Sequence, residues 1–204
     1  MNYFKTFKPL IALFIIVVLT SLACGSSTNG ATVVTPTTGA GESNSNPPVE
    51  QPTKEVEQKP LGSSRTNPAP FGSEISSDDM LFSIVEVIRP ADELVAKGNM
   101  FNSTPEPEKE YIFVKVKITC QKSADDKCSV TPFTFKLVNS SGNVVDADFM
   151  VAGVAGLLET SDLFGGASVE GYLSFIIDKA ETNPILMYEP ILIGDPFYLE
   201  VTQK

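Results

Sequence analysis

Residues 73–204 are predicted to fold as an all-β domain, an antiparallel β-sandwich. Short segments with alternating apolar and polar residues recur along this region, and a two-residue period is typical of strands with one buried face. Glycine, proline, asparagine and serine separate these segments, as turns require. Six or seven short strands, with one brief helical candidate at residues 91–97, favour two packed antiparallel sheets.

The first strands of this domain are predicted at residues 80–88 and 110–119. Pro90 ends the first, because proline has no N–H group to donate to a sheet. In residues 110–119, isoleucine and valine occupy alternate positions, while lysine and threonine lie on the other side. We therefore expect one buried and one solvated face.

A hairpin is predicted next, from residues 131–138 to residues 144–145. The turn residues Asn139 to Asn143 connect the two segments. We expect three apolar side chains of the first segment to share its buried face: Phe133, Phe135 and Leu137.

The last strands are predicted at residues 171–178, 185–188 and 196–202, each with period-two alternation or a short apolar run. Gly165 and Gly166 precede the first of them. A phosphate-binding loop would need a strand before and a helix after these glycines, so we expect a turn here.

The N-terminus has the three-part layout of a secretory signal, which we assign to residues 1–23. Lys5 and Lys8 precede an unbroken apolar run at residues 10–19. This run is too short to cross about 30 Å of hydrocarbon, which takes about 20 apolar residues. We therefore expect a cleaved signal peptide and an exported protein.

Cys24 follows this signal directly. The sequence Leu22-Ala23-Cys24-Gly25 resembles the lipobox of bacterial lipoproteins, although Ser21 stands where leucine is preferred. The resemblance implies that the Cys24 thiol is acylated and becomes the new N-terminus. The protein would then be extracytoplasmic and lipid-anchored to the bacterial cell membrane. The alternative is ordinary secretion with a free thiol, which is a liability in an oxidising compartment.

Residues 24–72 are predicted to be the lipidated N-terminus followed by a disordered linker. The segment is rich in serine, threonine, asparagine, glycine, proline and glutamate, without apolar periodicity. Such a composition cannot bury enough surface to offset the entropy of ordering the chain.

The charge and composition exclude several classes of function. Fifteen Lys and Arg stand against 25 Asp and Glu, for a net charge of −10, which opposes binding to nucleic acid. The chain has no histidine, so Ser-His-Asp, Cys-His and histidine-ligated metal chemistry are excluded. It also has no tryptophan, which disfavours sugar stacking. We expect no cofactor.

The strand pattern also carries a family likeness. The segment at residues 111–119, the turn with Ser141-Gly142-Asn143, the run at residues 165–175 and the closing strands resemble the domain of unknown function 4352 family. These are bacterial exported lipoproteins and surface proteins with an immunoglobulin-like sandwich. The resemblance implies that fold over residues 82–201 and a role in extracytoplasmic binding or envelope association, and it offers no catalytic residues.

Cys120 and Cys128 bracket a polar loop of seven residues at the end of a strand. Because the protein is expected outside the cytoplasm, we predict a disulfide between them. It would stabilise the fold by about 2.5 kcal/mol on the chain-entropy estimate. Redox activity would favour a CxxC spacing, and a zinc site would need further ligands.

Four aspartates are weak candidates for calcium ligands. Asp125 and Asp126 lie in the loop between the cysteines, and Asp146 and Asp148 are expected on one side of their strand. Calcium requires six to eight oxygen ligands, and the spacing is not that of an EF-hand loop. Solvated surface carboxylates are the favoured interpretation, with no metal.

Residues 149–158 are almost wholly apolar, rich in glycine and without a clear period. The favoured interpretation is a core crossover. The alternative is an exposed loop that docks on a partner, through four candidate residues: Phe149, Met150, Val154 and Leu157.

The leading hypothesis for function is a non-catalytic binding module for a protein or cell-envelope partner, anchored to the membrane through Cys24. The alternative is a structural spacer or assembly factor of the envelope. A carboxylate-based hydrolase is the third hypothesis, which would need two facing acids about 5 to 10 Å apart in a cleft.

Overall fold

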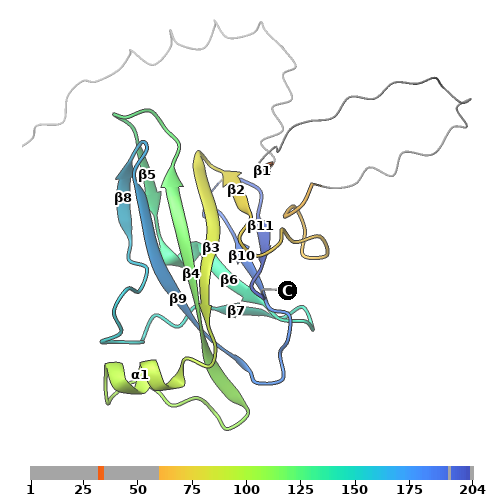
Figure 1. Ribbon diagram of the computed structural model, residues 1–204, viewed down its shortest axis with the longest axis vertical. Coiled ribbons are helices and arrows are strands. Elements are labelled where there is room, and N and C mark those ends of the chain that lie inside the picture. The colour runs from red at the N-terminus through yellow and green to blue at the C-terminus, as the bar shows by residue number, and fades with distance from the viewer. Residues whose placement is uncertain (1–31, 35–59, 193, 203–204) are drawn as a thin grey trace, which may run out of the picture.

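The computed structural model describes residues 32–34, 60–192 and 194–202. Within them the chain forms antiparallel sheets with a single α-helix (Figure 1). The strands are β1 (Thr32–Val34), β2 (Glu74–Ser77), β3 (Met80–Ile88), β4 (Lys109–Cys120), β5 (Lys127–Val130), β6 (Phe135–Val138), β7 (Val144–Asp146), β8 (Ser161–Phe164), β9 (Ser168–Asp178), β10 (Ile185–Tyr188) and β11 (Phe197–Glu200). The helices are α1 (Asp92–Gly98) and a 3-10 turn, η1 (Pro132–Thr134).

The larger sheet has the order β1-β2-β3-β4-β9. Its longest strand, β4, lies between the two next longest, β3 and β9. The ladder between β4 and β9 runs without interruption from Lys109 opposite Asp178 to Thr119 opposite Ser168. In Figure 1 these two strands lie side by side along the length of the domain. β-Branched residues that alternate along β4 explain both its length and its burial.

The second sheet has the order β11-β10-β6-β7, and β5 pairs with β8 in a small separate sheet. The predicted hairpin is present as β6 and β7, which pair antiparallel. The main core lies between the sheets: buried apolar side chains of β3, β4 and β9 meet those of β6, β10 and β11. Four rings gather at its centre: Phe82, Phe135, Tyr188 and Phe197. The antiparallel β-sandwich is therefore confirmed.

A second, smaller core lies on the other face of the large sheet. Ala91 and Val95 of the α1 segment pack there with Tyr111 and Phe113 of β4, and Val151 completes the cluster. Asp92 and Glu93 lie in the first turn of the helix and Lys97 lies in its last turn, and these charges suit the helix dipole. This second core holds the apolar segment at residues 149–158 through Val151, Val154 and Leu157.

The structure corrects the predicted face of Phe133. It belongs to η1, not to a strand, and its side chain is largely exposed, whereas Phe135 and Leu137 are buried. Pro132 begins this turn, and the Thr131 hydroxyl accepts a hydrogen bond from the Phe133 N–H. The local turn chemistry therefore interrupts the alternation before β6 begins.

The structure also moves the boundary between linker and domain. Residues 60–72, expected in the linker, pack on the domain, and Ala69 is completely buried in the main core. Backbone hydrogen bonds join Ala69 to Tyr198 and Glu200 of β11. Thr32–Val34, also expected in the linker, forms β1. The predicted signal peptide, Cys24 and the rest of the predicted linker lie outside the described residues.

Within the part of the chain that the structure describes, no helix combines the length and apolar character needed to cross a bilayer.

Candidate functional site

The apolar loop, defined here as residues 147–160 between β7 and β8, is held along the outer edge of β9. The Asp148 N–H donates to the Ser174 carbonyl at 2.7 Å, and the Leu158 N–H donates to the Tyr172 carbonyl at 2.9 Å. The Tyr172 N–H in turn donates to the Gly156 carbonyl at 2.8 Å. The loop thus fills hydrogen-bonding positions that a further strand would occupy.

Asn102 ties the middle of the apolar loop to the segment after α1. Its side-chain nitrogen donates to the carbonyls of Val95 and Ala152, at 2.7 and 2.9 Å. Its side-chain oxygen accepts the Ala152 N–H at 2.9 Å. Gly98 and Gly153 approach closely beside this bridge: a Cβ on Gly153 would overlap the Gly98 carbonyl, and a Cβ on Gly98 would crowd the Val154 side chain and the Ala152 carbonyl. One amide side chain therefore joins two loops that are 50 residues apart.

Tyr111 and Asp148 fix the start of the loop. The Tyr111 hydroxyl donates to Asp148 Oδ2 at 3.0 Å, and the Met150 N–H donates to Asp148 Oδ1 at 2.9 Å. Burial, followed by this hydrogen bond to Asp148, raises the pKa of Tyr111 to about 12. The phenol therefore remains a hydrogen-bond donor at neutral pH, and both Asp148 oxygens are engaged in holding the loop.

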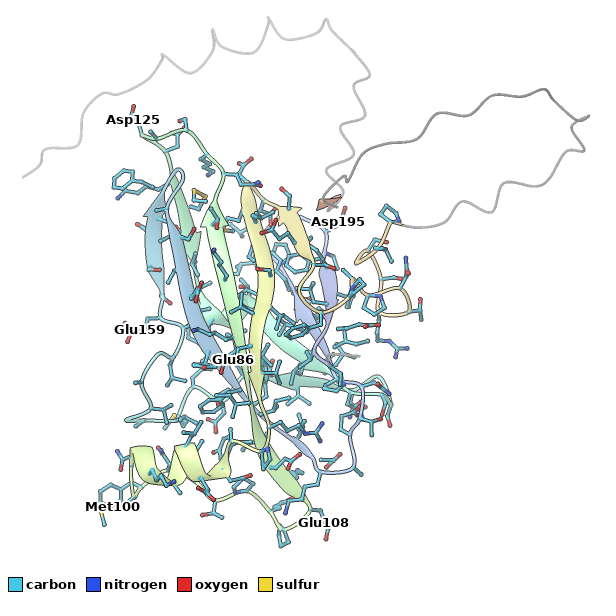
Figure 2. The ribbon with its side chains drawn as sticks, viewed as in Figure 1. Glu86, Met100, Glu108, Asp125, Glu159 and Asp195 are labelled. Carbon is cyan, nitrogen blue, oxygen red and sulfur yellow. A yellow bond between two sulfur atoms is a disulfide. The ribbon has the colours of Figure 1, made fainter. Side chains whose placement is uncertain are left out.

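The outward side of this region carries large apolar side chains. Phe149 is 46% exposed and Met150 83%, while Met100 and Phe101 beyond α1 are 86% and 87% exposed. The ring of Phe133 lies 4.4 Å from that of Phe149 between centroids. We call these five residues the apolar surface. Figure 2 labels Met100 at the α1 end of the molecule, opposite Asp125 and Asp195.

An open groove of about 180 Å³ adjoins this surface. Its lining is mainly apolar and comes from η1, the apolar loop and β9: Pro132, Ala147, Asp148, Phe149, Val151, Leu157, Leu158, Glu159, Tyr172, Leu173 and Ser174. The Ser174 hydroxyl is buried and has no hydrogen-bond partner. Phe149 therefore belongs both to the apolar surface and to the lining of this groove.

The four candidate partner-binding residues divide into two pairs. Phe149 and Met150 project from the molecule, as a docking loop requires. Val154 and Leu157 are partly buried and pack on the second core with Tyr172. The loop is thus both a core crossover and a carrier of exposed side chains. Met100, Phe101 and Phe133 were not predicted as part of this surface, although each is a large apolar residue in a turn-rich segment.

The predicted disulfide is present. Cys120 and Cys128 are joined, with Cα atoms 5.7 Å apart, and both are buried at the edge of the main core. The loop between them is exposed throughout. The disulfide therefore links β4 to β5 and closes a polar loop at the end of the molecule far from α1 (Figure 2).

The four aspartates proposed as weak calcium ligands do not come together. Asp126 accepts the Ser123 hydroxyl, Asp146 lies 3.7 Å from the Lys136 ammonium, and Asp148 binds Tyr111. Asp148 also lies beyond the end of β7, so it does not share a strand face with Asp146. Among the described residues, no three histidines, cysteines or acids are grouped closely enough to hold a metal ion.

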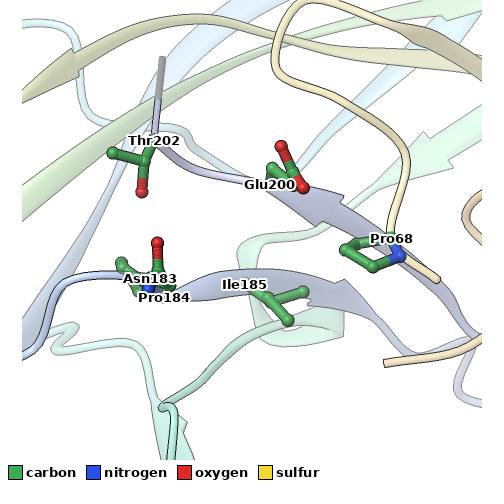
Figure 3. Close-up of a pocket in the computed structure, with 6 residues that line it drawn as sticks. All are labelled: Pro68, Asn183, Pro184, Ile185, Glu200 and Thr202. Atoms are coloured by element: carbon green, nitrogen blue, oxygen red, sulfur yellow. The ribbon is translucent and has the colours of Figure 1, made fainter. Parts of the chain in front are cut away.

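A second cavity, of about 310 Å³, lies beside the C-terminal end of β11 (Figure 3). It is lined by Pro68, Asn183, Pro184, Ile185, Glu200 and Thr202. Of these six residues only Glu200 is ionisable, so the lining offers no facing pair of carboxylates.

Comparison with known proteins places this domain in a family. A family model described as "Domain of unknown function (DUF4352)" matches residues 71–197. The chain belongs to this family. The suspected resemblance is therefore confirmed, and the matched region contains β2 to β10, α1 and the disulfide of this DUF4352 domain. No curated protein matches the chain.

Three solved structures are similar to the DUF4352 domain. The yjhA protein of Bacillus subtilis is 17% identical, with a TM-score of 0.51, and the match covers 66% of this chain and 99% of that one. A "putative lipoprotein (ycdA)" from Bacillus subtilis is 20% identical, with a TM-score of 0.47 over 64% of this chain and 39% of that one. The secreted protein MPT63 of Mycobacterium tuberculosis is 8% identical, with a TM-score of 0.41 over 64% and 84%. The first likeness supports the fold, and the two weaker ones add no argument.

Proposed function

We propose that the chain is an extracytoplasmic lipoprotein, anchored through Cys24, whose sandwich is a non-catalytic module that binds a protein or envelope partner. The observation that carries this proposal is the apolar surface of Met100, Phe101, Phe133, Phe149 and Met150. Large apolar side chains gathered on a soluble domain are typical of interaction sites. Aromatic and methionine side chains are also enriched at the centres of protein interfaces.

The way in which the surface is held supports a binding role. Phe149 and Met150 follow Asp148, whose backbone and carboxylate are both fixed, and Phe101 precedes Asn102, which bridges the two loops. A surface that is already ordered loses less conformational entropy when a partner binds. The second core beneath it means that the exposed side chains are not needed for folding.

Three ionisable groups near the groove, Asp148, Tyr111 and Tyr172, support a non-catalytic role. Asp148 uses both oxygens to hold the loop, and Tyr111 is kept protonated at neutral pH. The pKa of Tyr172, which also lines the groove, is raised to about 12 by burial and by its hydrogen bond to Glu86. Neither tyrosine is poised as a nucleophile or a base at neutral pH.

The test is crosslinking on intact cells with Met150→Asp as the disrupting variant. Leu192→Asp is the matched control, because Leu192 is also strongly exposed and lies in the loop before β11. We expect one stoichiometric partner with the unaltered protein and with the control, and its loss with Met150→Asp. Both variants should keep the melting temperature of the unaltered protein, because neither side chain is buried.

Two outcomes would contradict the proposal. If Met150→Asp still captures the same partner, the apolar surface is not the binding site. If the unaltered protein crosslinks to a scatter of neighbours, the spacer or assembly role is favoured instead. Metabolic labelling with a fatty acid, compared between the unaltered protein and Cys24→Ala, tests the anchor separately.

A further inference from the structure

The outer edge of β2 is a strand-acceptor site, and a segment close to the N-terminus occupies it. Thr32, Val33 and Val34 pair antiparallel with Ser76, Ile75 and Glu74. β1 is thus the terminal strand of the large sheet, beside β2 in Figure 1. Between β1 and the next described residue, Pro60, lie 25 residues of sequence.

Without β1, the edge of β2 would have unpaired backbone groups. β2 is only four residues long and pairs with β3 on its other side. Open sheet edges attract further strands, and an extended segment that adds to an edge gains backbone hydrogen bonds almost independently of its side chains. All three residues of Thr32–Val34 are β-branched, and such residues favour the extended conformation that this edge accepts.

The geometry points to a role for this contact: β1 sets the distance between the domain and its membrane anchor. This inference rests on the proposed acylation of Cys24. Only seven residues separate Cys24 from Thr32, and fully extended they reach about 25 to 30 Å. If β1 leaves the edge, the chain from Cys24 to Pro60 reaches about 120 Å. β1 on β2 thus holds the domain close to the lipid surface, and its release lets the domain extend.

The contact is short enough to be reversible. Three residue pairs join β1 to β2, whereas eleven join β4 to β9. The ladder of β1 therefore contributes far fewer hydrogen bonds, and it can open while the sandwich stays folded. A partner that binds the apolar surface far from the membrane would favour the extended state.

The first experiment traps the strand by a disulfide in the full-length protein. Thr32→Cys with Ser76→Cys places two thiols at paired positions, and the control combines Thr32→Cys with Ser103→Cys, in the exposed segment between α1 and β4. Under mild oxidation we expect the paired variant to close within one molecule about ten-fold faster than the control, because pairing raises the effective concentration. Equal rates of closure in the two variants would show that β1 does not pair with β2. A covalent dimer would show that a second copy fills the edge, and it would also overturn the inference.

The second experiment measures the spacing in vesicles of phosphatidylethanolamine and phosphatidylglycerol. Energy transfer is followed from a dye at Asp125→Cys to an acceptor in the headgroups. Val33→Pro with Val34→Pro removes the N–H groups of two adjacent residues, one of which faces β2. We expect transfer to fall by about two-fold or more as the reach increases, and to stay unchanged in the control Ser43→Pro with Asn44→Pro, which adds two prolines outside β1. Unchanged transfer in the β1 variant would overturn the inference.

The two proposals can fail separately. If mass spectrometry finds Cys24 without lipid, the anchor is wrong, although intramolecular trapping of β1 can still be observed. If Cys24 carries lipid but Thr32→Cys does not close with Ser76→Cys, the anchor stands and the spacing role is wrong.

Discussion

Two irregular segments of the molecule are held in place by opposite means. Residues 121–127 are polar and exposed, and the disulfide between Cys120 and Cys128 closes them. The apolar loop has no covalent closure, and it is held by burial of Val151 and by hydrogen bonds to Asn102 and Tyr111. A polar loop has little surface to bury, so it is held by the crosslink and by backbone hydrogen bonds, such as those from the Gln121 N–H to Asp79 and from the Gly165 N–H to Asp126. An apolar loop can be ordered by packing alone.

The comparison predicts that backbone crowding affects the apolar loop most. In Gly153→Ala, the new Cβ would overlap the Gly98 carbonyl, and Gly153 has a φ of +71°. We expect the free energy of unfolding to fall by about 3 to 4 kcal/mol, from overpacking together with the left-handed backbone. Urea denaturation measures this loss. Gly166→Ala is the control, since its φ is +85° but nothing lies near the added Cβ. Equal losses in both variants would mean that the contact with Gly98 is unimportant.

Loss of the disulfide should have the next largest effect. Replacing Cys120 and Cys128 together with alanine should lower the free energy of unfolding by about 2.5 kcal/mol, because the unfolded chain regains the entropy of an open loop. Amide hydrogen exchange should accelerate at residues 121–127 and remain slow at Ala152, whose N–H is bound to Asn102. Faster exchange at both places would show that the two loops are coupled.

Asn102→Ala removes the bridge between the apolar loop and α1. Two donated bonds and one accepted bond are lost, and we expect a fall of about 2 kcal/mol in the free energy of unfolding. Asn102→Asp keeps the acceptor for the Ala152 N–H but turns a carboxylate oxygen toward the carbonyls of Val95 and Ala152, so its loss should be at least as large. The bridge would be structurally irrelevant if thermal melting of both variants matched that of the unaltered protein.

The smallest expected effect concerns the Tyr111 hydroxyl. Tyr111→Phe should cost about 1 kcal/mol at neutral pH, the usual contribution of one hydrogen bond. The folded pKa of Tyr111 is raised from 10.0 to about 12 by burial and by Asp148. Its contribution is therefore complete below pH 10 and is lost as the pH rises towards 12. Denaturation measured between pH 9 and 12 should show the free energies of unfolding of the unaltered protein and of Tyr111→Phe converging. A constant difference over this range would contradict the prediction.

Much of the fold could be predicted because alternation and turn residues act locally. The spans of β3, β4, β9 and β10 and the helix α1 agree with the sequence patterns. The short strands β2, β5 and β8 were missed, because polar residues fill half or more of their positions, whereas the equally short β10 is wholly apolar. The buried Ala69 was also missed, because its neighbours have the composition of a linker and only its contact with β11 orders it.

The candidate site was only half predictable. The composition of residues 149–158 marked the apolar loop, and Phe149 and Met150 are indeed exposed. Which residues of the loop point inward depends on the second core and on Asn102, a residue 50 positions away from Ala152. No local pattern reports such a contact. Phe133 joined the surface because Thr131 and Pro132 form a turn where alternation predicted a strand.

The backbone contacts along β9 and β11 have a consequence for the proposed anchoring at a membrane surface. The apolar loop fills the free side of β9, and the segment at residues 62–69 fills that of β11. Proteins confined to a surface meet at high local density, and exposed strand edges then lead to aggregation. With these two edges already satisfied, neighbouring copies held at such density cannot join their sheets through β9 or β11.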